Sequence, residues 1–118
     1  MNTPGLLVLS AARTAISTFG GALKDVPLTQ TATTAVPEAI ARSGLGAADI
    51  GHVVMGNLIP TDVRDAWLSR VAAIEAGIPQ ETPAFNVNRV CGSALQAGIS
   101  AAQSLLLGDA DVAPVPSR

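Results

Sequence analysis

The segment 91–108, CGSALQAGISAAQSLLLG, constrains the fold of this chain most, because it carries no charged residue. Its Ala, Leu and Ile residues recur at helical spacing, and Gly108 ends the predicted helix. A helix without charges is normally buried on more than one side, whereas a helix that covers one face of a small α/β domain carries a polar, hydrated face. We therefore expect this helix to lie in the central layer of a larger structure, of which the chain supplies a part. The alternative is a surface helix that is merely rich in alanine.

The remaining chain alternates between short apolar runs and segments with helical spacing, bounded by glycine and proline. The predicted order is strand, helix, strand, helix, strand, helix, at 6–12, 30–46, 51–57, 64–77, 84–88 and 91–108, with a last strand beginning at Asp111. This alternation favours an α/β fold with a mostly parallel sheet, right-handed crossovers and flanking helices. The run 6–12 is apolar apart from Ser10, which predicts a strand covered on both faces, and the run 51–57, with a glycine at each shoulder of its apolar centre, predicts a second buried strand.

Single residues determine details of the two earlier helices. Thr29 is the predicted N-cap of the first. Pro37 lacks a backbone donor, so this helix is predicted either to kink or to begin near Pro37. In the second helix, Trp67 lies on the predicted apolar face.

The length, charge and composition of the chain limit its possible functions. With 118 residues the chain has room for one domain, and its net charge of −2 without like-charge runs gives no footprint for nucleic acid. No uninterrupted apolar run reaches membrane-spanning length, so we expect no membrane partner. Cys91 and His52 are the only residues of their types, too few for a disulfide or a structural zinc site. We expect no metal and a cytoplasmic, reducing location.

Cys91 is placed where a predicted strand turns into a helix, followed by Gly92 and Ser93. The N–H groups and dipole of a helix N-terminus favour a thiolate and can receive an oxyanion, as in a nucleophile elbow. A lone cysteine is nevertheless more often a small buried hydrophobe. His52, on a buried strand, is not assigned as its base. A thiol-redox module is the weaker alternative, since Cys91 has no resolving cysteine.

The stretches LSAARTAISTFGGALKDVP, VVMGNLIP, ETPAFNVNRVCGSALQA and SLLLGDADV resemble successive N-terminal blocks of the thiolases, the acetyl-CoA acetyltransferase and β-ketothiolase family. The resemblance runs from about residue 6 to 112 in one register. Ala94 departs from it, since the family's usual motif is CGSG, as do Ala15 and Pro37.

The resemblance implies a thiolase N-terminal half-domain within an α-β-α-β-α layered fold whose central layer holds the helix after the nucleophile. It implies acyl transfer between acyl-CoA thioesters, forming or cleaving 3-ketoacyl-CoA in fatty acid metabolism. Cys91 would be the acyl-thioester nucleophile, with its backbone N–H in an oxyanion hole. Coenzyme A and acyl-CoA would be substrates, with no cofactor, in a protein that is homo-oligomeric at full length.

We expect residues 1–112 to form the half-domain, which is incomplete, and residues 113–118 to be a tail outside the family pattern. Pro114 and Pro116 would each remove a donor from an interior strand, as after a truncation or frameshift. The family's histidine base, its second cysteine and its asparagine-histidine site have no counterpart in the chain. The alternative function is thus a truncated, non-catalytic thiolase fragment that self-associates or needs a complementary half.

Overall fold

The computed structural model describes residues 5–116. The ends of both predicted domains, residues 1–4 and 117–118, lie outside the described residues. The elements are helix α1 (Leu28–Ser43), 3₁₀ helix η1 (Ala47–Asp49), strand β1 (Val53–Gly56), 3₁₀ helix η2 (Val63–Trp67), helix α2 (Leu68–Glu75), strand β2 (Ala84–Val87) and helix α3 (Ser93–Leu107). This order confirms the predicted strand and helix alternation from α1 onward.

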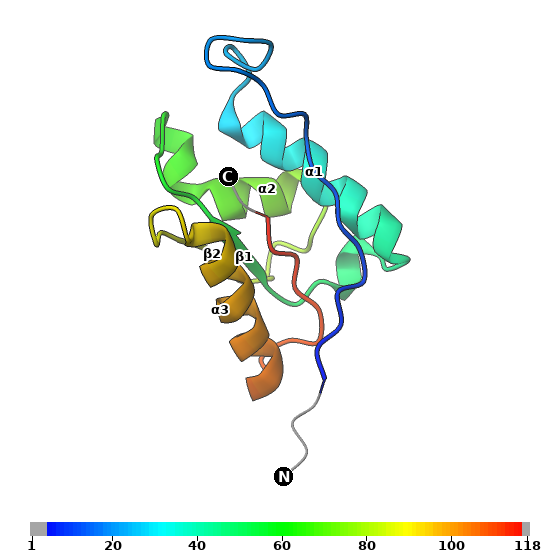
Figure 1. The fold of residues 1–118 in the computed structure, drawn as a ribbon. Helices are drawn as coiled ribbons and strands as arrows, with labels where there is room; N and C mark the ends of the chain where they lie inside the picture. Colours follow the sequence, from blue (N-terminus) through cyan, green and yellow to red (C-terminus); the bar gives the residue numbers. More distant parts are fainter. Residues whose placement is uncertain (1–4, 117–118) are drawn as a thin grey trace.

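Strands β1 and β2 pair in parallel, with Val53 opposite Ala84. All four β1 residues are buried, and successive side chains point to opposite faces. Val53 and Met55 join the core cluster of α1 and α2, whereas Val54 packs against α3. The sheet therefore separates α1 and α2 from α3, as Figure 1 shows, and the α/β prediction is confirmed.

Helix α1 begins earlier than its predicted N-cap. Its N-cap is Pro27, without a side-chain hydrogen bond, and Thr29 is a buried residue of the first turn. Proline suits a helix start because its fixed φ is already helical. Pro37 lies inside the helix, so the prediction of a start near Pro37 is wrong. Gly44, with φ 78°, ends α1 in the left-handed conformation that glycine adopts without strain.

The predicted helix 64–77 is divided into η2 and α2 because two aspartates cap the first part. The Asp62 side chain accepts from the Arg64 N–H at 3.0 Å, and the buried Asp65 carboxylate accepts from Thr61 and Asp62 N–H groups at 2.7 and 2.9 Å. Trp67, placed on the apolar face by the sequence pattern, is 61% exposed. The pattern assumed one continuous helix, and the helical face rotates where η2 changes into α2.

The prediction that the segment 6–12 forms a buried strand is wrong in both respects. It belongs to no sheet, and Leu7 and Val8 are 84% and 91% exposed. It runs along α1, where Ser10 Oγ donates to the Ala39 carbonyl at 2.6 Å (Figure 1). An apolar run becomes a buried strand only where a neighbouring edge and two covering faces exist.

The last predicted strand, from Asp111, is present as an extended segment that, within the described residues, accepts hydrogen bonds from β1 and its flank without donating any in return. Its Val112, Pro114 and Pro116 carbonyls receive the N–H groups of Gly51, Val54 and Gly56 at 3.1, 3.4 and 3.0 Å, in that order. In parallel pairing the returning donors alternate with these acceptors, which places them at 114 and 116. Both positions are proline, which has no N–H group, so the predicted loss of these two donors is confirmed. Over the described residues the pairing is one-sided, with hydrogen bonds running only from β1 and its flank to this segment.

Helix α3 is covered on one face only within the described residues. Ser93, Ala97 and Ala101 are its buried residues, whereas Leu95 and Leu107 are 73% and 79% exposed. The chain therefore covers a single face of α3, and burial of the other faces stays a prediction. The window Val90–Leu107, with mean hydropathy 1.3, is apolar and long enough to be a candidate for crossing a membrane, although the core helix of a soluble protein has the same properties.

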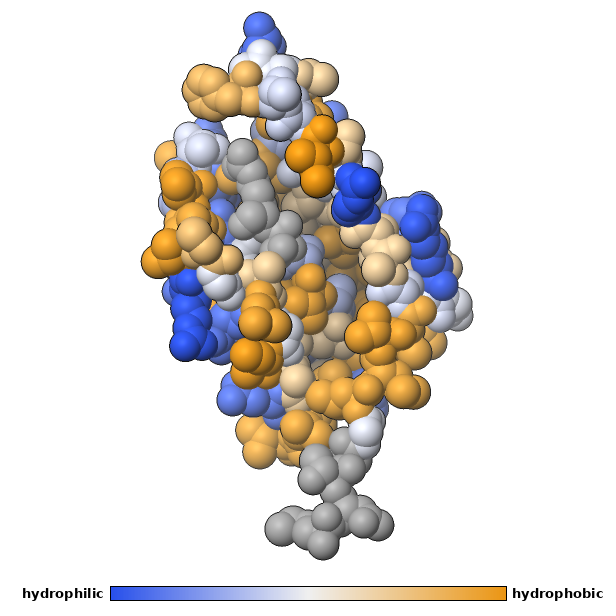
Figure 2. All heavy atoms as spheres, in the orientation of Figure 1, coloured by the Kyte–Doolittle hydropathy of each residue, from blue (hydrophilic) through white to orange (hydrophobic). Residues whose placement is uncertain are grey.

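A hollow of about 860 Å³ lies between the segment 6–17, α1, the inner part of α3 and residues 111–116. Figure 2 shows hydrophobic side chains around it. Apolar surface is thus exposed on the side where the segment 6–12 does not pair with the sheet.

Candidate active site

Cys91 is exposed and lies in the turn between β2 and α3, at the carboxyl end of the parallel strands. Ligands of open α/β sheets bind at this edge. The exposure rules out the alternative that Cys91 is a small buried hydrophobe of the core. The structure thus has the strand-to-helix geometry that the sequence predicted around this thiol.

The elbow is tight because α3 begins directly against β1. A Cβ atom added to Gly56 would lie 2.8 Å from the backbone carbon and oxygen of Ser93 and 2.9 Å from the Ala94 nitrogen. Only glycine at position 56 permits this approach. The last residue of β1 therefore fixes the depth at which the first turn of α3 is placed.

Side chains of the 84–93 stretch tie the elbow to its surroundings. Asn86 accepts from the Ser69 N–H at 2.9 Å, which holds the start of α2, and Asn88 donates to the Leu58 carbonyl at 3.0 Å. Ser93 is 2% exposed, and its Oγ accepts from the Arg89 N–H at 2.9 Å. These contacts hold the ends of both strands together around Cys91.

The backbone donors near the thiol differ in whether they have a partner among the described residues. The Gly92 and Ser93 N–H groups donate to the Arg89 and Val90 carbonyls at 3.0 and 3.2 Å. Both are therefore engaged within the turn and neither is free to receive an oxyanion, whereas the sequence predicts that N–H groups at this helix start can receive one. Among the hydrogen bonds of the described residues, none involves the Cys91 N–H or its thiol.

His52 takes no part in the elbow's hydrogen bonds. It directly precedes β1, at the end of the strand opposite Gly56, and its ring makes an edge-on contact with Phe85 at a centroid distance of 5.5 Å. Neither ring nitrogen has a hydrogen-bond partner among the described residues. Its position at the far end of the strand agrees with the sequence-based decision not to assign it as base.

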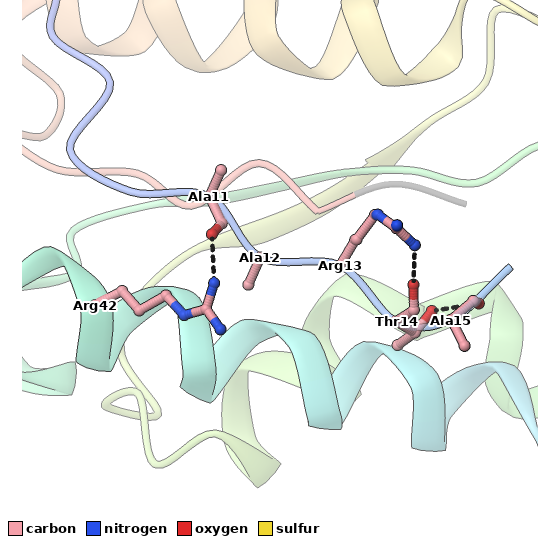
Figure 3. A pocket seen from close by; sticks show the side chains of 6 residues that line it. All are labelled: Ala11, Ala12, Arg13, Thr14, Ala15 and Arg42. Atoms are coloured by element: carbon pink, nitrogen blue, oxygen red, sulfur yellow. Dashed lines mark hydrogen bonds between the residues drawn. The ribbon is translucent and has the colours of Figure 1, made fainter.

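A second concavity, of about 590 Å³, is lined by Ala11, Ala12, Arg13, Thr14, Ala15 and Arg42. Figure 3 shows its two guanidinium groups turned to backbone carbonyls: Arg42 donates to Ala11 at 3.3 Å and Arg13 to Thr14 at 3.0 Å. Arg42 also pairs with Glu38 at 2.6 Å. Both arginines are therefore engaged in local contacts. Within the part of the chain that the structure describes, no group of three or more His, Cys, Asp or Glu residues could hold a metal ion.

Sequence reasoning missed the residues that hold the elbow. Asn88 was not singled out, and Ser93 was noted only as a neighbour of Cys91, although Asn88 donates to the Leu58 carbonyl and Ser93 to the Val90 carbonyl. Asn57, also not singled out, donates to the Asp65 carbonyl in η2. One local signal was present: Asn88 accepts from the N–H two residues on, the Asx-turn that asparagine favours before a change of direction. The contact between Gly56 and Ser93 has no local signal, because it joins residues far apart in the sequence.

Fold and site together define an α/β half-domain that presents an exposed cysteine at a strand-to-helix elbow. The family model "Thiolase, N-terminal domain" matches residues 6–115. The chain therefore belongs to the thiolase family, as its N-terminal half-domain.

Curated relatives agree with this assignment. The chain is 53% identical over 111 residues to the β-ketothiolase BktB of Cupriavidus necator, covering 94% of this chain and 28% of that protein. It is 41% identical over 110 residues to an acetyl-CoA acetyltransferase of Syntrophomonas wolfei, covering 93% and 28%. The chain thus spans about a quarter of the length of these relatives.

Solved structures show the same fold. Human mitochondrial 3-ketoacyl-CoA thiolase in complex with CoA superposes with a TM-score of 0.87 at 32% identity, over 90% of this chain and 27% of that one. The acetyl-CoA acetyltransferase of Bacillus anthracis superposes with a TM-score of 0.84, also at 32% identity, over 93% and 28%. The predicted thiolase half-domain is therefore confirmed, whereas its boundary at residue 112 and the tail 113–118 stay predictions.

Proposed function

We propose that this chain supplies the nucleophile of thiolase-type acyl transfer. The Cys91 thiolate attacks the thioester carbon of an acyl-CoA, and coenzyme A leaves as its thiol after taking up a proton, so that the acyl group stays on Cys91 as a thioester. The α-carbanion of a second acyl-CoA then attacks this thioester, which yields a 3-ketoacyl-CoA and frees Cys91. In the reverse direction, coenzyme A cleaves a 3-ketoacyl-CoA.

The exposed Cys91 at the β2–α3 elbow is the observation that carries this proposal. The Cys91 N–H, which has no hydrogen bond to the described residues, supports a role in the oxyanion hole, because a negative oxygen on the attacked carbon would need such a donor. The similarity to a β-ketothiolase and an acetyl-CoA acetyltransferase supports acyl transfer, and the human thiolase structure with CoA supports acyl-CoA and coenzyme A as substrates. No cofactor or metal enters the scheme.

We also propose a cytoplasmic, homo-oligomeric protein of fatty acid metabolism, without nucleic acid or membrane partners. The single cysteine outside any disulfide and the absence of like-charge runs support this setting.

The second candidate is a non-catalytic thiolase fragment that needs a complementary half. The exposed apolar face of α3, with Leu95, Ile99 and Leu106, favours it, since a face of this kind is normally covered. The two candidates differ in whether Cys91 becomes acylated in the isolated chain.

A chimera tests the proposed chemistry separately from the question of whether this chain needs a complementary half. Residues 6–115 of this chain replace the matched segment of the Cupriavidus necator β-ketothiolase, and cleavage of acetoacetyl-CoA by coenzyme A is measured. We expect an active chimera and a loss of at least about a thousandfold on Cys91→Ala. A folded chimera that stays active after Cys91→Ala would overturn the role of Cys91.

The isolated chain is then incubated with radiolabelled acetyl-CoA. Stoichiometric labelling that is lost in Cys91→Ala would overturn the non-catalytic candidate. An active chimera together with an unlabelled isolated chain would support the requirement for a complementary half.

A further inference from the structure

Val90, directly before Cys91, has an unfavourable backbone conformation. Its φ is 49°, and it is the non-glycine residue with positive φ in the described range. A β-branched side chain in this left-handed region is rare, because its two γ-carbon atoms crowd the backbone. Such strain persists only where the surroundings enforce it, and it gathers at functional sites.

Two side chains bind both polar backbone groups of Val90. Asn88 Oδ1 accepts from the Val90 N–H at 2.9 Å, and Ser93 Oγ donates to the Val90 carbonyl at 2.6 Å. The same Ser93 Oγ accepts from the Arg89 N–H at 2.9 Å, so that one hydroxyl spans the turn. The Ser93 N–H also donates to the Val90 carbonyl, at 3.2 Å, so two side chains and one backbone donor set the orientation of the peptide groups on either side of Val90.

The Ser93 hydroxyl is also shielded and well placed for this role. Ser93 is 2% exposed, and its backbone lies against Gly56 at the end of β1. A buried hydrogen bond competes with less water than an exposed one, so it holds geometry more firmly. The hydroxyl therefore links the fixed end of β1 to the strained residue that precedes the nucleophile.

We propose that Ser93, with Asn88, is a positioning residue for Cys91: it holds Val90 in the left-handed conformation that turns the Cys91 thiol and N–H outward. The inference rests on the proposed role of Cys91 as nucleophile. Without the hydroxyl, Val90 relaxes to a negative φ, which rotates the peptide between Val90 and Cys91 and moves both Cys91 groups. Ser93 acts only through this turn and does not touch the acyl group.

The test measures the rate at which iodoacetamide alkylates the 118-residue chain, in which Cys91 is the only thiol. We expect Ser93→Ala to slow alkylation about tenfold and Asn88→Ala about threefold, each through one lost hydrogen bond to Val90. Ser100→Ala is the matched control, because it makes the same change on α3 but removes a bond to Gln96. Its rate is expected to stay within about twofold of the parent chain.

Rescue distinguishes positioning from general support of the fold. Glycine adopts positive φ without a steric cost, so Val90→Gly added to Ser93→Ala is expected to restore the rate to within about twofold. The backbone chemical shifts of residue 90, which report its φ, should change in Ser93→Ala and return in the double variant. If Ser93→Ala fails to fold, Asn88→Ala with and without Val90→Gly gives the same comparison on an exposed residue.

An alkylation rate unaffected by Ser93→Ala, or a folded double variant that stays slow, would overturn the proposal. The chimera with the β-ketothiolase separates this result from the proposed function. If the chimera stays active after Cys91→Ala, the role of Cys91 as nucleophile is refuted, but the alkylation rates still test the positioning role. If the chimera depends on Cys91 and the alkylation rates of the variants do not change, only the positioning role is refuted.

Discussion

Strand β1 (Val53–Gly56) and the segment 6–12 have similar apolar sequences, but β1 is buried and the segment 6–12 is largely exposed. Both are short runs that are apolar apart from Ser10 in the segment 6–12, yet Val53 and Val54 are 0% exposed while Val8 is 91% exposed. The difference lies in the neighbours: β1 has β2 at one edge, residues 112–116 at the other and helices on both faces. An apolar run specifies that a segment can be buried, and the surrounding elements decide whether it is.

The largest expected effect is the contrast between truncations in these two regions. Met55→Ala removes a side chain that is 1% exposed in the core cluster, and we expect a loss of about 3 kcal/mol in the free energy of unfolding. Leu7→Ala, at a residue 84% exposed, should change it by less than about 0.5 kcal/mol. Urea denaturation of both variants measures the contrast. Equal losses would mean that 6–12 is packed as tightly as β1.

A second prediction concerns the contact that places α3. The Cβ of Gly56→Ala would meet the Ser93 backbone at 2.8 Å, so we expect a loss of about 2 kcal/mol in unfolding free energy, together with slower alkylation of Cys91. Gly98→Ala is the matched control, since its Cβ meets nothing within 4 Å and lies in the interior of α3. That variant should gain about 0.5 to 1 kcal/mol. A harmless Gly56→Ala would show that the elbow does not depend on this close approach.

The same contrast explains how much the sequence could predict. Hydrophobic spacing located β1, β2 and α3 to within a few residues, and the strand-to-helix position of Cys91 followed from it. The exposure of Trp67 was missed, although Asp62 and Asp65 form the capping pattern that starts η2 and was available in the sequence. The hold of Ser93 on Val90 could not be predicted, because it depends on α3 meeting β1 at Gly56. Local patterns therefore found the elements, and tertiary contacts made the site.

The smallest expected effect concerns the edge that residues 112–116 occupy on β1. Val54 is fully buried, its N–H donates to Pro114, and its carbonyl faces position 116, where proline offers no donor. Pro116→Val supplies that donor and loses the conformational restriction of proline in the unfolded chain, whereas Pro60→Val, at an exposed loop residue, only loses the restriction.

We therefore expect Pro116→Val to be more stable than Pro60→Val by about 1 kcal/mol in urea denaturation, the net value of one hydrogen bond. The new amide at position 116 should also exchange its hydrogen slowly, because it would be paired with a buried carbonyl. Identical stabilities and a rapidly exchanging amide would show that the segment 112–116 rests against β1 without the register seen here. In that case the edge of β1, like the segment 6–12, would lack a partner in this chain.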